Sequence, residues 1–147
     1  IWYYCRGMNS KVKKLAPDAI IPSYAHKGDA GLDLYASETI IFLPGEYKSI
    51  PTGISLALPK GTVGLIWDKS GLSIKNGLKT LGGVVDASYR GEVLVGMINL
   101  GKKSYTFEKG HKIAQMLIQK VECVKIKEVV ELDKTSRGKG GFGSTGK

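Results

Sequence analysis

Short apolar runs separated by glycine and proline are the feature that most restricts the fold of this chain. The segments "ETIIFL", "TVGLIW" and "EVLVGMINL" are followed or preceded by turn sequences such as "PGE" and "PKG", and helical periodicity is nearly absent. Many short strands at close spacing are typical of sandwiches and barrels. Twenty glycines in 147 residues favour tight turns and close backbone approaches. We therefore predict an all-β barrel or jelly roll.

The strands are predicted from apolar residues at every second position. Two runs show which side chains share a face: Ile54, Leu56 and Leu58 in the first, and Val63, Leu65 and Trp67 in the second. The runs "YTF", "IAQMLI" and "VECVKIKEV" are predicted as strands as well. One short helix is expected over 70–77, with Gly77 as its C-cap.

The length of 147 residues predicts one domain, and a hydrophobic fraction of 42% is enough for a core. The apolar alternation ends near Asp133, so we expect a β body over 8–132 and a flexible C-terminal arm over 133–147. Residues 1–7 are interpreted as an artificial or unstructured extension. No signal peptide or membrane span is seen, so we expect an intracellular protein, cytoplasmic or nuclear, without a membrane partner.

The net charge of +9 predicts an anionic partner, either a nucleotide polyphosphate or nucleic acid. The lysines are scattered, and no basic helical stripe or aromatic RNA-binding motif is present, so specific nucleic-acid binding is not expected. Cys5 and Cys123 form neither a metal-binding spacing nor a disulfide framework. The two histidines have no companion ligand at the spacing that zinc requires.

Two segments near the middle of the chain contain candidate polar sites. "AGLDLYA" places Asp33 inside an apolar run, where it faces solvent, pairs with a cation or lies near a metal. Considered alone, exposure to solvent is the favoured reading. "DKSGLSIKNG" offers Lys69, Ser70 and the backbone around Gly71 either as an anion-binding turn or as an ordinary serine N-cap.

The block "GGVVDASYRGEV" predicts a β-hairpin over 82–93 with an elongated tip. Asp86 at the end of the first strand is either a general base toward water or a side chain that caps the turn. Tyr89 near the tip can lie flat against a sugar or base. Further on, Gln115 lies among apolar residues, where it faces a ligand or satisfies a neighbouring backbone group.

The C-terminal segment 141–147 fits the glycine and lysine spacing of a phosphate-binding loop. No strand pattern leads into it, so the loop of a nucleoside triphosphatase is not predicted. Two readings remain, a disordered polar tail or a flexible glycine-rich segment whose backbone N–H groups turn toward an anion.

Five segments in order resemble the five motifs of trimeric dUTP pyrophosphatases (dUTPases): "AGLDLYA", "KSGL", "GVVDASYRGE", "GHKIAQ" and "RGKGGFGSTG". They extend over 30–146. The resemblance implies a homotrimer of distorted jelly-roll-like β barrels, with active sites built from more than one subunit and closed by the C-terminal arm. The implied reaction is Mg²⁺-dependent hydrolysis of dUTP to dUMP and pyrophosphate, which keeps uracil out of DNA and supplies dUMP for thymidylate synthesis.

The resemblance also implies roles for single residues. Asp86 would orient and deprotonate the water that attacks the α-phosphorus, and Asp33 would support the hydrated Mg²⁺ through water. The implied substrate contacts are Lys69, Ser70, Gly71 and Gln115 at the phosphates, Tyr89 under the deoxyribose, the backbone around Gly83 and Leu94 at the uracil edge, Phe142 stacked on uracil, Arg137 at the γ-phosphate, and Gly143, Ser144 and Thr145 in the closing arm.

Two positions depart from the family pattern. The second motif usually has arginine where this chain has Lys69, and the fourth usually reads Gly-Asp-Arg where this chain has Gly110, His111 and Lys112. Lysine cannot make the planar two-pronged contact of arginine. We expect rearranged contacts to the phosphates or between the motifs.

Two other functions are weighed against dUTP hydrolysis. A dCTP deaminase shares the barrel, but its site is centred on glutamate, whereas this chain has Asp86 and a complete fifth motif. A regulatory protein-binding role, known for some viral and phage members, or nonspecific nucleic-acid binding would be an additional function.

Overall fold

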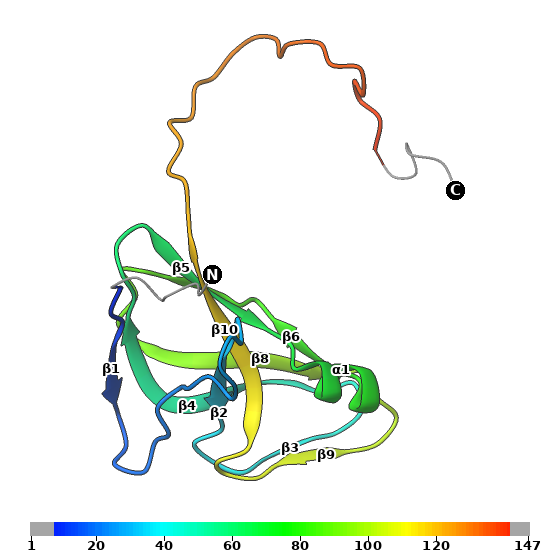
Figure 1. Ribbon diagram of the computed structural model, residues 1–147. Coiled ribbons are helices and arrows are strands. Elements are labelled where there is room, and N and C mark those ends of the chain that lie inside the picture. The colour runs from blue at the N-terminus through cyan, green and yellow to red at the C-terminus, as the bar shows by residue number, and fades with distance from the viewer. Residues whose placement is uncertain (1–7, 142–147) are drawn as a thin grey trace.

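The computed structural model describes residues 8–141, which form three antiparallel sheets and one short helix (Figure 1). The first sheet has the order β1-β4-β8-β6, with strands β1 (Lys11–Lys14), β4 (Tyr47–Ala57), β8 (Glu92–Asn99) and β6 (Leu78–Leu81). The second has the order β2-β10-β5-β7, with strands β2 (Leu32–Tyr35), β10 (Lys112–Lys120), β5 (Thr62–Trp67) and β7 (Val84–Asp86). The third pairs β3 (Ile40–Phe42) with β9 (Tyr105–Phe107), and the helix is α1 (Ser70–Asn76).

The prediction of an all-β, distorted jelly-roll-like fold is confirmed. The sheets keep separate edges and do not close into one continuous barrel. Strands β1 and β6 were not predicted, because "KVKK" and "LKTL" are too short and too polar to show a clear alternation.

One cluster of buried apolar side chains joins all three sheets. Phe42 on β3 and Phe107 on β9 are fully buried, and their rings meet edge to face with centroids 6.1 Å apart. Aromatic pairs in this arrangement add to the stabilisation from burial alone. The small third sheet is therefore attached to the core through these two rings.

Strand β4 confirms the first predicted apolar face, since Ile54, Leu56 and Leu58 are all buried. The second prediction is also confirmed, since Val63, Leu65 and Trp67 share one face of strand β5. That face is partly exposed, and Trp67 is 54% exposed.

The buried face of β5 has smaller residues because the core approaches it closely. A Cβ atom at Gly64 would lie 3.0 Å from Met116 Sδ and 3.2 Å from a methyl carbon of Leu58. The core therefore requires a small residue at this position.

The predicted β-hairpin over 82–93 is wrong. Strand β7 pairs with β5 in the second sheet, whereas β8 pairs with β4 and β6 in the first. The turn sequence and flanking strands were correct, but the chain uses the turn to pass from one sheet to the other. Residues 84–94 thus form a corner between two sheets.

The predicted strand over 121–129 is also wrong. The chain leaves the body after Lys120 and runs as an extended segment away from the sheets (Figure 1). No other part of residues 8–141 covers its apolar side chains: Val124, Ile126 and Leu132 are 74%, 90% and 83% exposed. Alternation indicated an extended segment with an apolar face, but could not show that none of the described strands lies beside it.

The predicted helix is confirmed as α1, and Gly77 ends it in the left-handed conformation with φ of 73°. The N–H of Gly77 donates to the carbonyl of Ser73. Within residues 8–141, no helix has the length and apolar character to cross a membrane.

Removal of one core ring should destabilise the fold strongly. We expect Phe107→Ala to lower the free energy of unfolding by about 3–5 kcal/mol, because it leaves a cavity opposite Phe42. Thr106→Ala, on the exposed face of the same strand, is the matched control and should change it by about 0.5 kcal/mol or less. Urea unfolding at one protein concentration measures both, and equal losses would contradict the assigned core.

Candidate functional site

Register in the second sheet brings three segments that are distant in sequence into one row. Gln115 on β10 lies opposite Asp33 on β2 and opposite Trp67 on β5. Lys69 and Ser70 follow directly after the end of β5. The first, second and fourth sequence motifs therefore meet at one end of this sheet.

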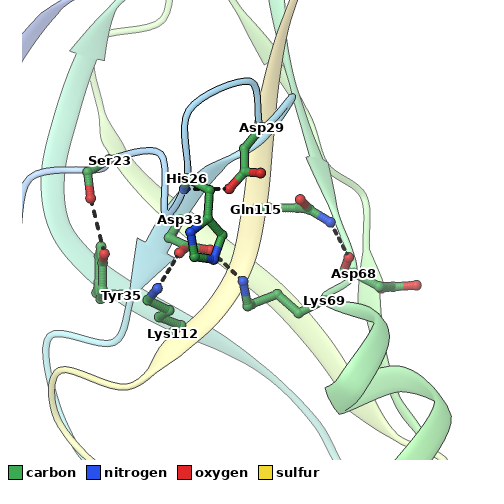
Figure 2. A network of polar contacts seen from close by, with 9 residues as sticks. All are labelled: Ser23, His26, Asp29, Asp33, Tyr35, Asp68, Lys69, Lys112 and Gln115. Carbon is green, nitrogen blue, oxygen red and sulfur yellow. Dashed lines mark hydrogen bonds and ion pairs between the residues drawn. The ribbon is translucent and has the colours of Figure 1, made fainter.

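The centre of this region is a buried carboxylate held by two lysines (Figure 2). Asp33 is 3% exposed. Lys69 Nζ lies 2.5 Å from Oδ1, and Lys112 Nζ lies 2.6 Å from Oδ2 at ion-pair distance but outside hydrogen-bond geometry. The favoured reading of Asp33 as solvent-exposed is wrong, and the alternative of a cation partner is confirmed.

Charge pairing outweighs burial at Asp33. Burial raises the pKa of the Asp33 carboxyl. The ammonium groups of Lys112 and Lys69 together lower it by more than burial raises it, so the pKa is below its ordinary value. The contact with Asp33 raises the pKa of Lys112. Asp33 and Lys112 are therefore charged at neutral pH, and two lysines face one carboxylate. The cluster keeps an excess positive charge that favours an anionic ligand.

The turn between β5 and α1 leaves polar groups available. Lys69 is the N-cap residue of α1, and Ser70 is its first residue, so Ser70 is not the N-cap that one sequence reading expected. Within residues 8–141, the Ser70 hydroxyl makes no hydrogen bond. A Cβ at Gly71 would meet no atom within 4 Å, so the space above the turn is open. A phosphate can approach this turn.

Gln115 satisfies a neighbouring backbone group, one of its two predicted roles. Its Nε2 donates to the carbonyl of Asp68 over 2.9 Å (Figure 2). A Cβ at Gly31 would lie 2.4 Å from Gln115 Oε1, so only glycine fits beside the amide. The amide is fixed between β2 and the turn that precedes α1.

A second region lies at the corner between the two large sheets. It is a pocket of about 210 Å³, here called the corner pocket, and it is lined by Val84, Val85, Asp86, Tyr89, Glu92, Val93 and Leu94. Tyr89 N donates to the carbonyl of Asp86 over 3.0 Å, and the Tyr89 hydroxyl donates to the carbonyl of Glu92 over 3.1 Å. These bonds fix the aromatic ring at the rim of the pocket.

Asp86 has a carboxylate that is free to act on a ligand. The residue is exposed, and within the described part of the chain its side chain makes no hydrogen bond or ion pair. The turn is closed by backbone groups, so the alternative that Asp86 caps the turn with its side chain is not supported. Apolar walls, an aromatic ring and one free carboxylate suit a small molecule with a flat ring and a polar reacting group.

One copy of the chain does not bring the two regions together. Asp86 pairs with Val63 at the start of β5, whereas Lys69 follows the end of that strand. The strand between Val63 and Trp67 spans about 13 Å at about 3.3 Å per residue. Gly83 lies between the two regions, in a neighbouring hollow, with its carbonyl accepting from Ile66 N over 2.8 Å.

Arg137 is the predicted arm residue that the structure describes. The segment that contains it runs away from the sheets (Figure 1). Arg137 Nε donates to the carbonyl of Gly140 over 3.0 Å. The remaining predicted arm contacts lie outside the described residues: Phe142, Gly143, Ser144 and Thr145.

Sequence reasoning missed three polar contacts. Lys112 was noted only as a departure from a motif, yet it is a partner of Asp33. Asp68 is bound to Thr80 on β6, and Glu92 Oε1 accepts from Gly53 N over 2.7 Å. Asp68 directly precedes the second motif and Glu92 ends the third, but no periodicity could reveal their partners in distant strands.

Substitution of the buried carboxylate should change the response to acid. The pKa of Asp33 is lower in the folded protein than the roughly 3.9 of an unfolded aspartate, so its stabilisation is present above about pH 4 and is lost as pH falls toward the folded pKa. We expect Asp33→Asn to lower the melting temperature at pH 7. The difference in melting temperature from the unaltered protein should narrow as the pH falls below about 4. A difference independent of pH would contradict the ion cluster.

Comparison with known proteins identifies relatives along nearly the whole chain. The sequence model of the dUTPase family matches residues 17–146. Deoxyuridine 5'-triphosphate nucleotidohydrolase of Clostridium kluyveri is 51% identical over 141 residues, covering 95% of this chain and 99% of the relative. The protein of the same name from Clostridioides difficile is 50% identical over 140 residues, covering 94% of this chain and 98% of the relative.

Solved structures agree with the sequence relatives. A variant of the Staphylococcus bacteriophage 80alpha dUTPase with dUpNHpp superposes with a TM-score of 0.88 at 31% identity, covering 94% of this chain and 98% of that one. A variant dUTPase from phage phi11 of S. aureus, described with a structural Mg(II) ion, gives a TM-score of 0.78 at 28% identity, covering 84% and 97%. With the family matched from residue 17 to residue 146, this chain belongs to the dUTPase family.

Proposed function

We propose that this dUTPase hydrolyses dUTP to dUMP and pyrophosphate with Mg²⁺, in sites that form only where copies of the chain meet in a homotrimer. The observation that carries the proposal is the separation of the corner pocket from the lysine-carboxylate cluster by the length of β5. The corner pocket suits the nucleoside and the cluster suits the phosphates. A nucleotide can contact both only if a second copy places its cluster beside the first copy's pocket.

The C-terminal segment supports the same assembly. Its exposed apolar side chains, such as Val124 and Ile126, lie on an extended backbone that no strand within residues 8–141 covers. Contiguous exposed apolar surface marks a contact with another molecule. A neighbouring copy would cover this face and bring Arg137 and the following arm residues over its site.

The corner pocket supports the roles proposed for the base and sugar. Tyr89 would pack under the deoxyribose and leave no room for a 2′-hydroxyl, while the backbone around Leu94 and Gly83 reads the uracil edge. Leu94 lines the pocket, and Gly83 lies at the far end of the adjoining strand β7. Phe142 of the arm would stack on the exposed face of the uracil.

Asp86 is proposed as the base that activates water. Its free, exposed carboxylate accepts a proton from water as the water oxygen bonds to the α-phosphorus. The bond from the α-phosphorus to the bridging oxygen breaks, and pyrophosphate leaves with the electron pair. Phosphoryl transfer depends mainly on positioning and charge neutralisation, which the rest of the site provides.

The positive cluster is proposed to bind the phosphate chain. Lys69, Ser70, Gly71 and Gln115 would contact the phosphates, with Arg137, Gly143, Ser144 and Thr145 added by the arm. Lys69 is 29% exposed at its side chain, so it can turn from Asp33 toward a phosphate while Lys112 keeps the carboxylate paired. Of the two lysines that replace the family's arginines, Lys112 would thus pair with Asp33 and Lys69 would bind the anion.

The residues fit a Mg²⁺ ion that arrives with the substrate. Within residues 8–141, no group of three His, Cys, Asp or Glu side chains could hold a metal. Asp33 faces two ammonium groups, so it can reach a metal only through water. Magnesium keeps several waters and binds readily through one carboxylate and phosphate oxygens. When bound, it would neutralise phosphate charge.

The two alternative functions have less support. The matched relatives are named as dUTP nucleotidohydrolases, and nothing favours the deamination of dCTP. Some phage 80alpha dUTPase structures are described as controlling transfer of virulence genes. A regulatory role for this chain stays a prediction without a specific contact to support it.

Replacement of the proposed base should abolish turnover while dUTP still binds. We expect Asp86→Asn to lower kcat by at least about 10²-fold, the usual contribution of a positioned general base. Asp18→Asn is the matched control, since Asp18 is an exposed aspartate paired with Lys109 and distant in sequence from every motif. Pyrophosphate release from dUTP with Mg²⁺ measures both variants. Equal turnover in Asp86→Asn would remove Asp86 from this role.

Complementation should reveal sites shared between subunits. We expect Asp86→Asn and a chain truncated after residue 136 each to be nearly inactive alone. Unfolded together and refolded as a mixture, they should recover activity, because an intact Asp86 from one copy can meet an intact arm from the other. Refolding each variant separately before mixing is the control. A mixture that stays inactive would show that each arm serves its own chain's site.

A further inference from the structure

Asp68 connects the turn before α1 to the first sheet. Its Oδ1 accepts from both the backbone N and the hydroxyl of Thr80, each over 2.7 Å. Its Oδ2 lies 2.9 Å from Lys79 Nζ. The side chain is 21% exposed, so these contacts are partly shielded from water. Three donors from β6 thus hold one carboxylate.

The backbone of the same residue connects the turn to the second sheet. The carbonyl of Asp68 accepts from Gln115 Nε2 over 2.9 Å (Figure 2). Gln115 lies in register with Asp33, and the next residue, Lys69, is a partner of Asp33. Asp68 is therefore bound to a strand of each large sheet.

Helix α1 itself cannot fix the position of the phosphate turn. It has only seven residues, none of them buried, and its N-cap makes no side-chain hydrogen bond. Helices this short are marginal without tertiary support. Leu72 packs partly against the core, and Gly77 closes the far end. The start of the helix depends on the segment before it, where Asp68 is bound.

The charge of Asp68 is compensated within the same contacts. Burial raises the pKa of the Asp68 carboxyl. Lys79 and the Thr80 donors together lower it by more than burial raises it, so the pKa lies below the ordinary value. An unpaired carboxylate beside a triphosphate would repel it. The ion pair with Lys79 reduces this repulsion, and the hydrogen bonds of Asp68 with Thr80 are kept.

We propose that Asp68 is a positioning residue for the phosphates, which holds the turn of Lys69, Ser70 and Gly71 and the amide of Gln115 in their binding positions. The inference rests on the proposed function, because it takes this turn as the phosphate site. Asp68 acts through its neighbours and does not touch the substrate. Its effect is therefore confined to ligands that carry a phosphate chain.

The test compares Asp68→Ala with Asp68→Asn in the full chain. Asp68→Ala removes every side-chain acceptor, so we expect KM for dUTP and the inhibition constant of dUpNHpp to rise about 10-fold or more, with kcat reduced less. The inhibition constant of deoxyuridine, which has no phosphate, should change less than about 2-fold. Asp68→Asn keeps the Oδ1 acceptor for Thr80 and should restore most of the affinity for dUpNHpp.

Two further variants separate positioning from general damage. Thr80→Val removes one of the two donors to Oδ1 with little change of shape. It should raise the inhibition constant of dUpNHpp, as Asp68→Ala does, but by a smaller factor. Asp18→Ala, the exposed control, should leave both inhibition constants unchanged. If Asp68→Ala does not fold, Asp68→Asn and Thr80→Val still carry the test.

The outcomes distinguish this inference from the proposed function. The role of Asp68 would be overturned if Asp68→Ala raised the inhibition constants of deoxyuridine and dUpNHpp by the same factor, or if it changed neither. The activity of the unaltered protein would stand in both cases. An unaltered protein that does not turn over dUTP would overturn the proposed function instead. In that case the binding of dUpNHpp to the variants still decides the role of Asp68.

Discussion

The pairing of one buried carboxylate with two lysines is the interaction on which the row of motifs at one end of the second sheet depends. Asp33 is on β2, Lys112 begins β10, and Lys69 precedes α1, so the ion cluster binds the turn before α1 to two strands that backbone pairing already joins. Burial of an unpaired carboxylate costs several kcal/mol, at an order-of-magnitude estimate, and this penalty opposes any arrangement that separates the three groups. The same requirement leaves one surplus positive charge at the surface.

A second constraint is that the fold keeps its two functional regions at opposite ends of β5. Asp86 and Tyr89 belong to the corner, while Ser70 and Gln115 belong to the row at the other end of the sheet. Each region is well defined by its own contacts within one chain. The proposed nucleotide site therefore depends on assembly and not on movement of the sheets within a subunit.

The sequence predicted the fold class, most strands, the helix with its Gly77 cap and the family, because these depend on local pattern and motif order. It did not predict that β7 and β8 belong to different sheets, since turn residues look alike in a hairpin and in a corner. It also favoured an exposed Asp33, which is buried. Burial and pairing of these residues are set by strands distant in sequence, which no local pattern records.

The corner pocket has walls that belong to two sheets without a backbone hydrogen bond between β7 and β8. A nucleoside that contacts Val84 on one wall and Leu94 on the other would therefore bind best at one angle between the sheets. Binding of the nucleoside and the angle between the two sheets are then thermodynamically coupled. A core substitution that loosens the contact between the sheets would stabilise an open corner in the unliganded protein. Binding would then have to close the corner, so the affinity for the nucleoside would fall by the free energy of that closure.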